Sequence, residues 1–258
     1  MTDPDRFKPV MQQIASGQAA MGFALGTTSL RAAEVLTNIG GNFIVIDMQH
    51  GEAEFEDLPW LLKALTYGGL PCIVRAASQD SVLIQRCLDL GADAIVVPYV
   101  NTVEEAQAIV LATKYPPQGE RSFGPVRAAR GTREYVTTAN ERHPVFVMLE
   151  TRQAIDCAEQ ILAVDGIAGG TIGPSDLSLS MGYDPLERPL SDEVEAAIER
   201  AAAAAKATDK IIGGFFGPMS PELLEKYVSQ GHRLFVLANE LYMIKQAGPA
   251  LLKSLGWR

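Results

Sequence analysis

The stretch FIVIDMQHG at residues 43–51 joins a continuous apolar run to a polar segment that holds an aspartate and a histidine. Phe43 to Ile46 are all apolar, and most of them are β-branched, as in a strand that is buried on both faces. Strands of this kind are typical of parallel sheets covered by helices. The stretch therefore predicts a buried parallel strand over 43–48 whose carboxyl end carries Asp47 and His50.

Seven further segments have the same character, and helical patterns with apolar residues at spacings of three and four separate them. The other expected strands are 19–25, 71–76, 94–98, 145–150, 167–173, 210–216 and 233–239. The expected helices are 55–67, 79–90, 103–114, 152–163, 191–208 and 221–230. Ser191, which two acids follow, is typical of a helix N-cap. Eight strands that alternate with helices predict an α/β protein with a (β/α)8 TIM-barrel fold.

The spacing of the strands favours one closed barrel over the main alternative, a doubly wound open sheet. No GxGxxG motif follows the first strand, as a dinucleotide-binding sheet of that kind would require. Most strands end 23 to 27 residues after the previous one, and two longer intervals hold the extra segments 115–144 and 174–190. Long loops in compact domains are more often functional than idle. No linker or low-complexity tract divides the chain, so we expect residues 1–258 to form a single domain.

Composition excludes several other classes of protein. The chain has 258 residues and a formal net charge of −9, with 47% hydrophobic residues, which is too apolar for a disordered chain. The acidic balance argues against nucleic acids and anionic membranes as partners. We expect neither a transmembrane helix nor a signal peptide at MTDPDRFKPV. Three cysteines without CxxC spacing (Cys72, Cys87 and Cys157) are interpreted as buried thiols in a reducing compartment, which predicts a cytoplasmic protein.

Chemistry-bearing residues gather at the carboxyl ends of the expected strands, where TIM barrels place their active sites. The second strand leads into Asp47 and His50, and the third ends in Arg75. The fifth ends in Glu150, and the sixth leads into Asp176 at an expected helix start. One imidazole, one guanidinium and three carboxylates are therefore predicted on one rim.

Each of these residues also has a structural interpretation. Asp176 could serve only as a helix cap, and Arg75 could pair with a structural acid. The two remaining histidines, His143 in a loop and His232 before the last strand, are interpreted as structural residues. A chance gathering of all the polar groups on one rim is much less expected than the same explanation for any single one.

The set suits a metal-dependent reaction of a 2-oxo acid. Glu150 and Asp176 offer hard oxygen donors, which suit Mg²⁺ or Mn²⁺ with open positions that a keto acid could fill. The helix start at Ser175 and Asp176 would supply backbone N–H groups to the substrate carboxylate. Arg75 would face the keto oxygen, where negative charge develops in an enolate.

Two further points favour this interpretation: a histidine is placed to act as a base, and no lysine is placed to act as a nucleophile. Asp47 could hold His50 in one tautomer and make it a general base. A Schiff-base aldolase needs a buried lysine at a strand end, whereas the relevant lysines fall in helices or strand starts. These are Lys63, Lys114, Lys206 and Lys210. An enolate stabilised by a metal ion is therefore the better inference.

Together, several segments resemble the HpcH/HpaI aldolase family, whose members are class II, metal-dependent pyruvate aldolases with a barrel of the phosphoenolpyruvate/pyruvate type. The similarity runs over nearly the whole chain. Its strongest segments are FIVIDMQHG (43–51), IVR (73–75), LDLGADAIVVPYV (88–100), ATKYPPQGERSFGPVRA (112–128), LET (149–151) and IGPSDLSLSMG (172–182).

The resemblance implies a role for each of the predicted site residues. It assigns an Asp–His dyad to Asp47 and His50, substrate polarisation to Arg75, metal binding to Glu150 and Asp176, and carboxylate binding to Ser175 and Asp176. It also implies a divalent ion (Mg²⁺, Mn²⁺ or Co²⁺). Asp89 would approach the site of a neighbouring subunit in a homohexamer, a trimer of dimers.

Two residues depart from the family pattern. Gln49 stands where many relatives have an acid, and Met148 stands where some have glutamine. Both departures concern the surroundings of the site, because neither replaces a metal ligand or the base. Arg121 and Arg127 could bind a distal carboxylate or pack at an interface, and neither is assigned to the site.

The sequence thus predicts a lyase that reversibly cleaves a 4-hydroxy-2-oxo acid to pyruvate or hydroxypyruvate and an aldehyde, through a metal-bound enolate. The alternatives are an acyl-CoA lyase of the malyl/citramalyl-CoA type and a noncatalytic barrel that binds 2-oxo acids. The expected partners are small-molecule substrates and further copies of the chain. Leu251, Leu252, Leu255 and Trp257 offer more apolar surface than a lone barrel helix needs, which favours a homo-oligomer.

Overall fold

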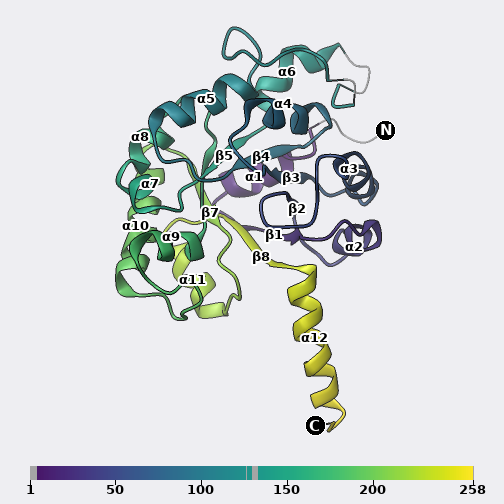
Figure 1. Cartoon of the computed structure of the whole chain (residues 1–258), viewed down its shortest axis with the longest axis vertical. Coiled ribbons are helices and arrows are strands. Elements are labelled where there is room, and N and C mark those ends of the chain that lie inside the picture. Colours follow the sequence, from purple (N-terminus) through teal and green to yellow (C-terminus); the bar gives the residue numbers. More distant parts are fainter. Residues whose placement is uncertain (1–4, 126, 130–132, 258) are drawn as a thin grey trace.

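Eight parallel strands close into a barrel in chain order, with β1 hydrogen-bonded to both β2 and β8. The structure is a computed structural model and describes residues 5–125, 127–129 and 133–257. Figure 1 shows the strands at the centre of the molecule with helices around them. The strands are β1 (Ala20–Leu25), β2 (Phe43–Asp47), β3 (Cys72–Arg75), β4 (Ala94–Val97), β5 (Val145–Met148), β6 (Gly169–Ile172), β7 (Ile211–Gly214) and β8 (Leu234–Asn239). The predicted TIM barrel is confirmed.

Each observed strand lies within the range predicted for it, and the predicted helices are also present. These helices are α3 (Leu58–Tyr67), α4 (Ser81–Asp89), α5 (Val103–Thr113), α10 (Asp192–Ala207) and α11 (Pro221–Ser229). The helix predicted at 152–163 is divided at Cys157 into α7 (Arg152–Asp156) and α8 (Ala158–Leu162). The Ser191 hydroxyl accepts a hydrogen bond from the Val194 N–H, which confirms it as the N-cap of α10.

Further helices lie outside the six predicted ranges, and most of them are short. They are α1 (Lys8–Ala15), α2 (Leu30–Leu36), α6 (Glu134–Arg142), α9 (Pro174–Met181) and α12 (Glu240–Ser254). The two extra segments thus contain α6 and α9, although residues 126 and 130–132 of the first lie outside the described residues. Residues 1–4, which begin the segment expected to lack a signal peptide, also lie outside them.

A small apolar cluster fills the barrel from below. Phe7, Val10 and Ile14 on and beside α1 pack against inward-facing strand residues such as Phe43 and Phe146. Next to them, the buried Arg6 forms an ion pair with Asp93, in which Arg6 Nη2 lies 2.7 Å from Asp93 Oδ2. Helix α1 therefore closes the end of the barrel where the strands begin and leaves the opposite rim for the site.

A larger cluster joins the outer faces of the strands to the surrounding helices. The inner and outer faces are both apolar, which explains why the strands are almost continuously hydrophobic. In β1, Gly22 permits the close approach of β2, because a Cβ at this position would lie 2.6 Å from the carbonyl oxygen of Phe43. Within the described part of the chain, no helix is long and apolar enough to cross a membrane.

Two of the cysteines and two of the histidines are buried, whereas Cys157 lines a cavity beside Tyr99. All three cysteines are free, and Cys72 and Cys87 are buried as predicted, whereas Cys157 is only half-buried because it lies at the break between α7 and α8. His143 and His232 are buried, in agreement with a structural role. Burial lowers the pKa of His143 to about 3 and that of His232 to about 4.

These two histidines predict that the fold loses stability in mild acid. A folded-state pKa below the ordinary value of about 6.5 means that the unfolded chain binds more protons between that value and the lowered one. The free energy of unfolding should therefore fall as the pH falls, by about 1.4 kcal/mol per pH unit for each imidazole between about pH 6 and 4.5. Urea unfolding at a series of pH values measures this slope.

The variant His232→Phe keeps an aromatic ring among Phe216, Tyr227 and Phe235 but removes one titrating group. For this variant, the free energy of unfolding should change less steeply with pH than for the wild type, by about 1.4 kcal/mol per pH unit. Equal slopes in the two proteins would contradict the assignment of His232 as a buried neutral group.

Candidate active site

Four of the predicted site residues lie at the carboxyl rim of the barrel, at or after the ends of β2, β3, β5 and β6. Asp47 and Arg75 are the last residues of β2 and β3. Glu150 follows β5 by two residues, and Asp176 lies in the first turn of α9, directly after β6. The register of the barrel pairs Asp47 with Arg75 on adjacent strands, so the sheet itself brings these two together.

A buried two-pronged ion pair joins Asp47 and Arg75. Arg75 Nε donates to Asp47 Oδ1 at 2.8 Å, and Arg75 Nη2 donates to Asp47 Oδ2 at 2.5 Å. Burial alone would raise the pKa of Asp47, but the hydrogen bonds and charge of Arg75 outweigh it and hold this pKa below its usual value. Both side chains are therefore charged, and the guanidinium is locked in one orientation.

The third guanidinium nitrogen of Arg75, Nη1, takes no part in this ion pair. Arg75 Nη1 lies 3.9 Å from the sulfur of Met148, a weak acceptor. The guanidinium also lies over the ring of Phe215, with 4.5 Å between the guanidinium carbon and the ring centroid. Arg75 thus offers Nη1 as a hydrogen-bond donor inside the barrel mouth. The pairing of Arg75 with an acid is confirmed, and this pairing fixes the orientation of the guanidinium.

His50 lies exposed on the loop after β2. The hydrogen bonds of Asp47 in the described residues go to Arg75 and to the backbone N–H groups of Gln49 and His50, at 3.0 and 3.2 Å. Asp47 therefore holds the loop that carries His50 rather than the imidazole ring itself. This differs from the expectation that Asp47 fixes the tautomer, since Arg75 takes the carboxylate face that the ring would need.

Glu150 is fully buried, and in the described part of the chain one of its two carboxylate oxygens accepts a hydrogen bond. Its Oε1 accepts a hydrogen bond from the backbone N–H of Tyr99 at 2.9 Å, whereas its Oε2 is buried and has no hydrogen-bond partner among the described residues. Burial raises the pKa of Glu150 to about 7, and the nearby charge of Asp176 adds to this effect. Gly173 makes room for the carboxylate, because a Cβ there would lie 2.4 Å from Glu150 Oε2.

Asp176 and Ser175 lie in the first turn of α9. The N-cap of this helix, Gly173, provides no side-chain cap, so the first-turn N–H groups of Ser175 and Asp176 have no capping side chain. The Asp176 carboxylate accepts a hydrogen bond from the Tyr99 hydroxyl at 3.0 Å. The Ser175 hydroxyl points elsewhere, because it donates to the carbonyl of Pro185 at 3.2 Å.

The two carboxylates Glu150 and Asp176 fit a hard divalent cation. They supply oxygen donors, and Glu150 Oε2 is a buried acceptor that a cation would satisfy. No group of three or more His, Cys, Asp or Glu side chains suited to a metal occurs in the described residues. A pair of carboxylate ligands would leave coordination positions for water and substrate.

Tyr99 is a site residue that the sequence interpretation missed. It follows β4, the one strand near the site whose end carries no charged group, and its backbone and hydroxyl bond both Glu150 and Asp176. Its position at a strand end, after VVP in residues 96–98, is the signal that could have found it.

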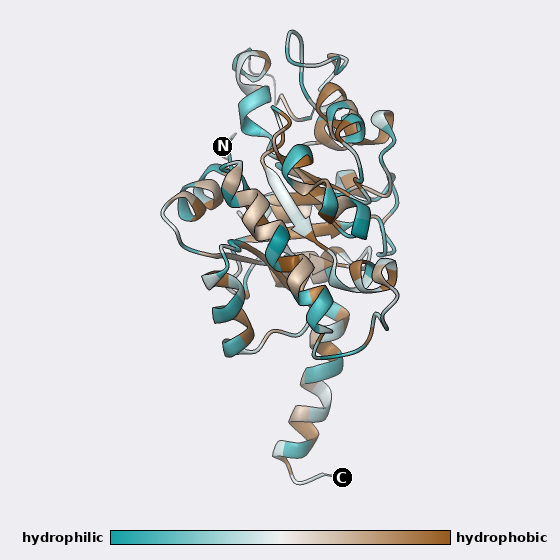
Figure 2. Ribbon diagram, turned by 90° about the vertical axis from the view of Figure 1, so that its left-hand side faces the viewer, coloured by the Kyte–Doolittle hydropathy of each residue, from teal (hydrophilic) through white to brown (hydrophobic). Residues whose placement is uncertain are grey.

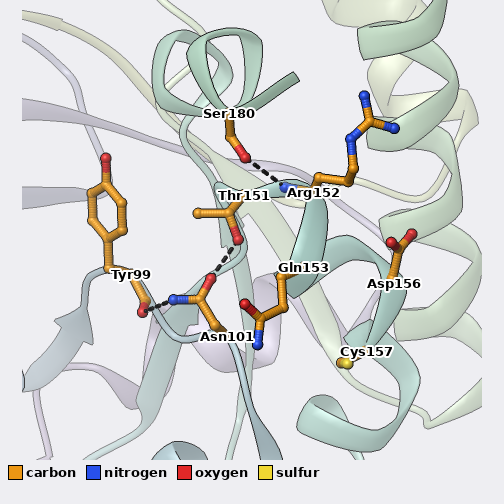
Figure 3. A pocket seen from close by; sticks show the side chains of 8 residues that line it. All are labelled: Tyr99, Asn101, Thr151, Arg152, Gln153, Asp156, Cys157 and Ser180. Atoms are coloured by element: carbon orange, nitrogen blue, oxygen red, sulfur yellow. Dashed lines mark hydrogen bonds between the residues drawn. The ribbon is translucent and has the colours of Figure 1, made fainter. Parts of the chain in front are cut away.

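A shallow cavity of about 590 Å³ lies beside the carboxylates, between the loops after β4 and β5 and the end of α9. Figure 3 shows Tyr99 at one side of this cavity, with Asn101 and Thr151 joined by a hydrogen bond next to it. Arg152 and Asp156 stand on the far side. The cavity is large enough for a small polar ligand and opens to the solvent.

Asp89 lies apart from the rim in a single chain. It ends α4, and its carboxylate forms an ion pair with the buried Arg121 at 2.6 Å. Arg121 also accompanies Tyr115 and Tyr135, which favours the packing role over substrate binding. Arg127 donates to the carbonyl of Leu90 at 2.6 Å, so it also fastens the chain near Asp89.

Comparison with known proteins identifies the family of this chain. The HpcH/HpaI aldolase/citrate lyase family model matches residues 20–246. A 2-dehydro-3,6-dideoxy-6-sulfogluconate aldolase from Pseudomonas putida is 37% identical over 93% of this chain and 94% of its own length. A hydroxypyruvate/pyruvate aldolase from Rhizorhabdus wittichii is 36% identical over 90% of this chain and 92% of its own.

A solved structure supports the same assignment. An HpcH/HpaI aldolase/citrate lyase family protein from Burkholderia cenocepacia J2315 superposes with a TM-score of 0.88 and 29% identity, over 96% of this chain and 98% of that one. The family model covers most of the barrel. The two relatives are named as aldolases, and this chain matches each of them over almost its full length. The chain therefore belongs to the HpcH/HpaI aldolase/citrate lyase family and is an aldolase, a carbon–carbon lyase.

Proposed function

We propose that the chain cleaves 4-hydroxy-2-oxo acids reversibly to pyruvate or hydroxypyruvate and an aldehyde, with the help of a divalent cation. Two unused polar groups at the rim carry this proposal. Glu150 Oε2 is buried and has no hydrogen-bond partner among the described residues. Arg75, whose guanidinium is held by Asp47, has Nη1 next to only a weak acceptor, the sulfur of Met148. A cation and a keto oxygen complement these two features.

Glu150 and Asp176 would hold Mg²⁺, Mn²⁺ or Co²⁺. The bound ion would supply positive charge next to the keto and carboxylate oxygens of the substrate. The first-turn N–H groups of Ser175 and Asp176 would bind the substrate carboxylate at the amino end of α9, where the helix dipole favours an anion. These contacts would place the keto group within reach of Arg75.

Arg75 would stabilise the charge that develops during cleavage. When the bond between C3 and C4 of the substrate breaks, its electron pair moves into an enolate whose negative oxygen derives from the keto group. Arg75 Nη1 would donate to this oxygen, and Asp47 holds the guanidinium in place beforehand, so that little reorganisation is needed during the reaction. Protonation at C3 then gives the 2-oxo acid product.

His50 would take the proton from the hydroxyl on C4, which becomes the carbonyl oxygen of the aldehyde. The loop after β2 carries this imidazole at the rim, where it is exposed to solvent and to substrate. In the direction of aldol addition, the same imidazole returns the proton. This base on strand two favours an aldolase over an acyl-CoA lyase, and the two curated relatives described above are named as aldolases.

Chelation tests the metal requirement. Treatment with EDTA should abolish pyruvate release, and Mg²⁺, Mn²⁺ or Co²⁺ should restore it. Glu150→Gln should weaken metal binding by well over about tenfold, since even losses of supporting groups around metal sites have effects of that order. Glu159→Gln, an exposed glutamate on α8, is the matched control and should bind the ion as the wild type does. Full activity of the metal-stripped enzyme would refute the metal requirement.

A second test separates the base from the rest of the site. His50→Ala should reduce aldol cleavage by roughly 10²–10⁴-fold, the usual contribution of a general base. Decarboxylation of oxaloacetate needs the enolate to be stabilised but has no C4 hydroxyl to deprotonate, so it should fall much less. Both rates are measured in one preparation of the variant. Equal losses would show that His50 supports binding in general and is not the aldol base.

The C-terminal helix supports the proposal that the chain is a homo-oligomer. Figures 1 and 2 show α12 extending away from the barrel with apolar and polar residues along its length. Every residue from 244 to 257 is exposed, including Leu251, Leu255 and Trp257. A lone helix of this length is only marginally stable in water, and apolar patches of this kind mark interaction sites. A second copy of the chain is the proposed partner.

The remaining organisation is proposed from the same features. We propose that the chain is a single domain, as expected for residues 1–258, and the closure of one sheet by β1 and β8 supports this. The family resemblance implies a hexamer, a trimer of dimers, in which Asp89 would reach the site of a neighbour. The three free cysteines suit the reducing cytoplasm. Neither nucleic acid nor membrane is proposed as a partner.

Light scattering at micromolar concentration tests the assembly and should give a mass of several chains. The double variant Leu251→Lys and Leu255→Lys should shift the protein toward smaller species, because it places charges on the apolar surface of α12. Leu186→Lys, at an equally exposed leucine outside this helix, should leave the mass unchanged. A monomeric wild-type protein would contradict the proposed oligomer.

A further inference from the structure

Tyr99 has an uncommon backbone conformation for an aromatic residue. Its φ is +56°, in the left-handed region that asparagine and glycine adopt more readily. Such a conformation is strained for a residue other than glycine and persists where the surrounding contacts hold it. The residue lies directly after Pro98 at the end of β4, on the same rim as the two carboxylates.

Four hydrogen bonds hold Tyr99 in place. Its N–H donates to Glu150 Oε1 at 2.9 Å, and its hydroxyl donates to Asp176 Oδ1 at 3.0 Å. Its carbonyl oxygen accepts from the side-chain amides of Gln79 at 2.7 Å and Asn101 at 2.8 Å. One residue therefore connects the carboxylate that follows β5 with the carboxylate that follows β6.

Two more contacts extend this connection across the loops. Figure 3 shows the side chain of Asn101 bonded both to the Tyr99 carbonyl and to the hydroxyl of Thr151, the residue after Glu150. The N–H of Arg152 donates to the Ser180 hydroxyl on α9 at 2.9 Å. The loops after β4 and β5 and the helix that carries Asp176 are thus fastened to one another around Tyr99.

We propose that Tyr99 is a positioning residue that presents Glu150 and Asp176 to the divalent cation. It occupies one oxygen of each carboxylate, Oε1 of Glu150 and Oδ1 of Asp176, and so directs the second oxygen of each toward the ion. In Glu150 this second oxygen is Oε2, which has no hydrogen-bond partner among the described residues. The inference deepens the proposed function and rests on its metal requirement.

The phenol contributes a bond that a smaller side chain would not supply. The hydroxyl of Tyr99 reaches Asp176 across the rim from the adjacent loop, whereas its N–H bond to Glu150 requires only the backbone. Removal of the hydroxyl alone should therefore release Asp176 and leave Glu150 held. Interactions of this kind, which orient metal ligands, typically change metal affinity by about 10- to 100-fold.

The test compares Tyr99→Phe with the wild type in a titration with Mn²⁺, followed by the electron paramagnetic resonance signal of the free ion. The variant should bind Mn²⁺ about 10- to 100-fold more weakly. The spectrum of the bound ion should also change, because the Asp176 ligand has lost its hydrogen bond. At saturating Mn²⁺, kcat should stay within a few fold of the wild type, whereas the Mn²⁺ concentration for half-maximal activity should rise.

Tyr67→Phe is the matched control, because Tyr67 is 81% exposed on α3 and should have no influence on the ion. A second variant, Tyr99→Gly, relieves the left-handed backbone while removing the ring, and it should also bind Mn²⁺ weakly. Mn²⁺ affinity of Tyr99→Phe within twofold of the wild type would overturn the inference. Failure of the wild type itself to bind Mn²⁺ would instead refute the metal requirement, so the two failures are distinguishable.

Discussion

The closure of the barrel between β1 and β8 is the constraint on which the rest of the structure depends. It makes the sheet continuous, so that all eight strands end on one rim. Charged residues at the ends of different strands are therefore brought to the same end of the barrel. Closure also requires close approach of backbones, as at Gly22, where a side chain would collide with Phe43. Below the rim, α1 and its buried neighbours fill the barrel, so the opposite end is the one that remains open to ligands.

At this rim, the surroundings give two buried carboxylates opposite electrostatic properties. Asp47 lies against Arg75, and the ion pair outweighs the cost of burial and lowers its pKa. Within the described part of the chain, the Tyr99 N–H is the one hydrogen-bond donor to Glu150, and burial raises the pKa of Glu150 to about 7. A charge that is already paired serves as a fixed support, whereas a poorly compensated one is a ready ligand for a cation. The difference separates Asp47, which orients Arg75, from Glu150, the proposed metal ligand.

The strand pattern predicted the fold and the position of most candidate site residues on the rim, because burial on both faces and the position of strand ends are local properties of the sequence. The partners of those residues could not be predicted in the same way. Asp47 and His50 are three residues apart, which favoured a dyad, but the register of β2 and β3 gives the carboxylate to Arg75. Helix α12 was also not among the predicted helices, and its residues 244–257 are all exposed.

Tyr99 shows most clearly why a list of charged strand ends is incomplete. Its role depends on a backbone conformation, and sequence patterns for aromatic residues do not predict a positive φ. Met148 is a related case, because its side chain lies next to the guanidinium of Arg75. A thioether is a weak acceptor, so it competes little for Arg75 Nη1 at 3.9 Å, whereas an amide oxygen at this position would bind that nitrogen firmly. The thioether therefore leaves Nη1, the nitrogen of Arg75 that is not bonded to Asp47, free to meet a substrate oxygen.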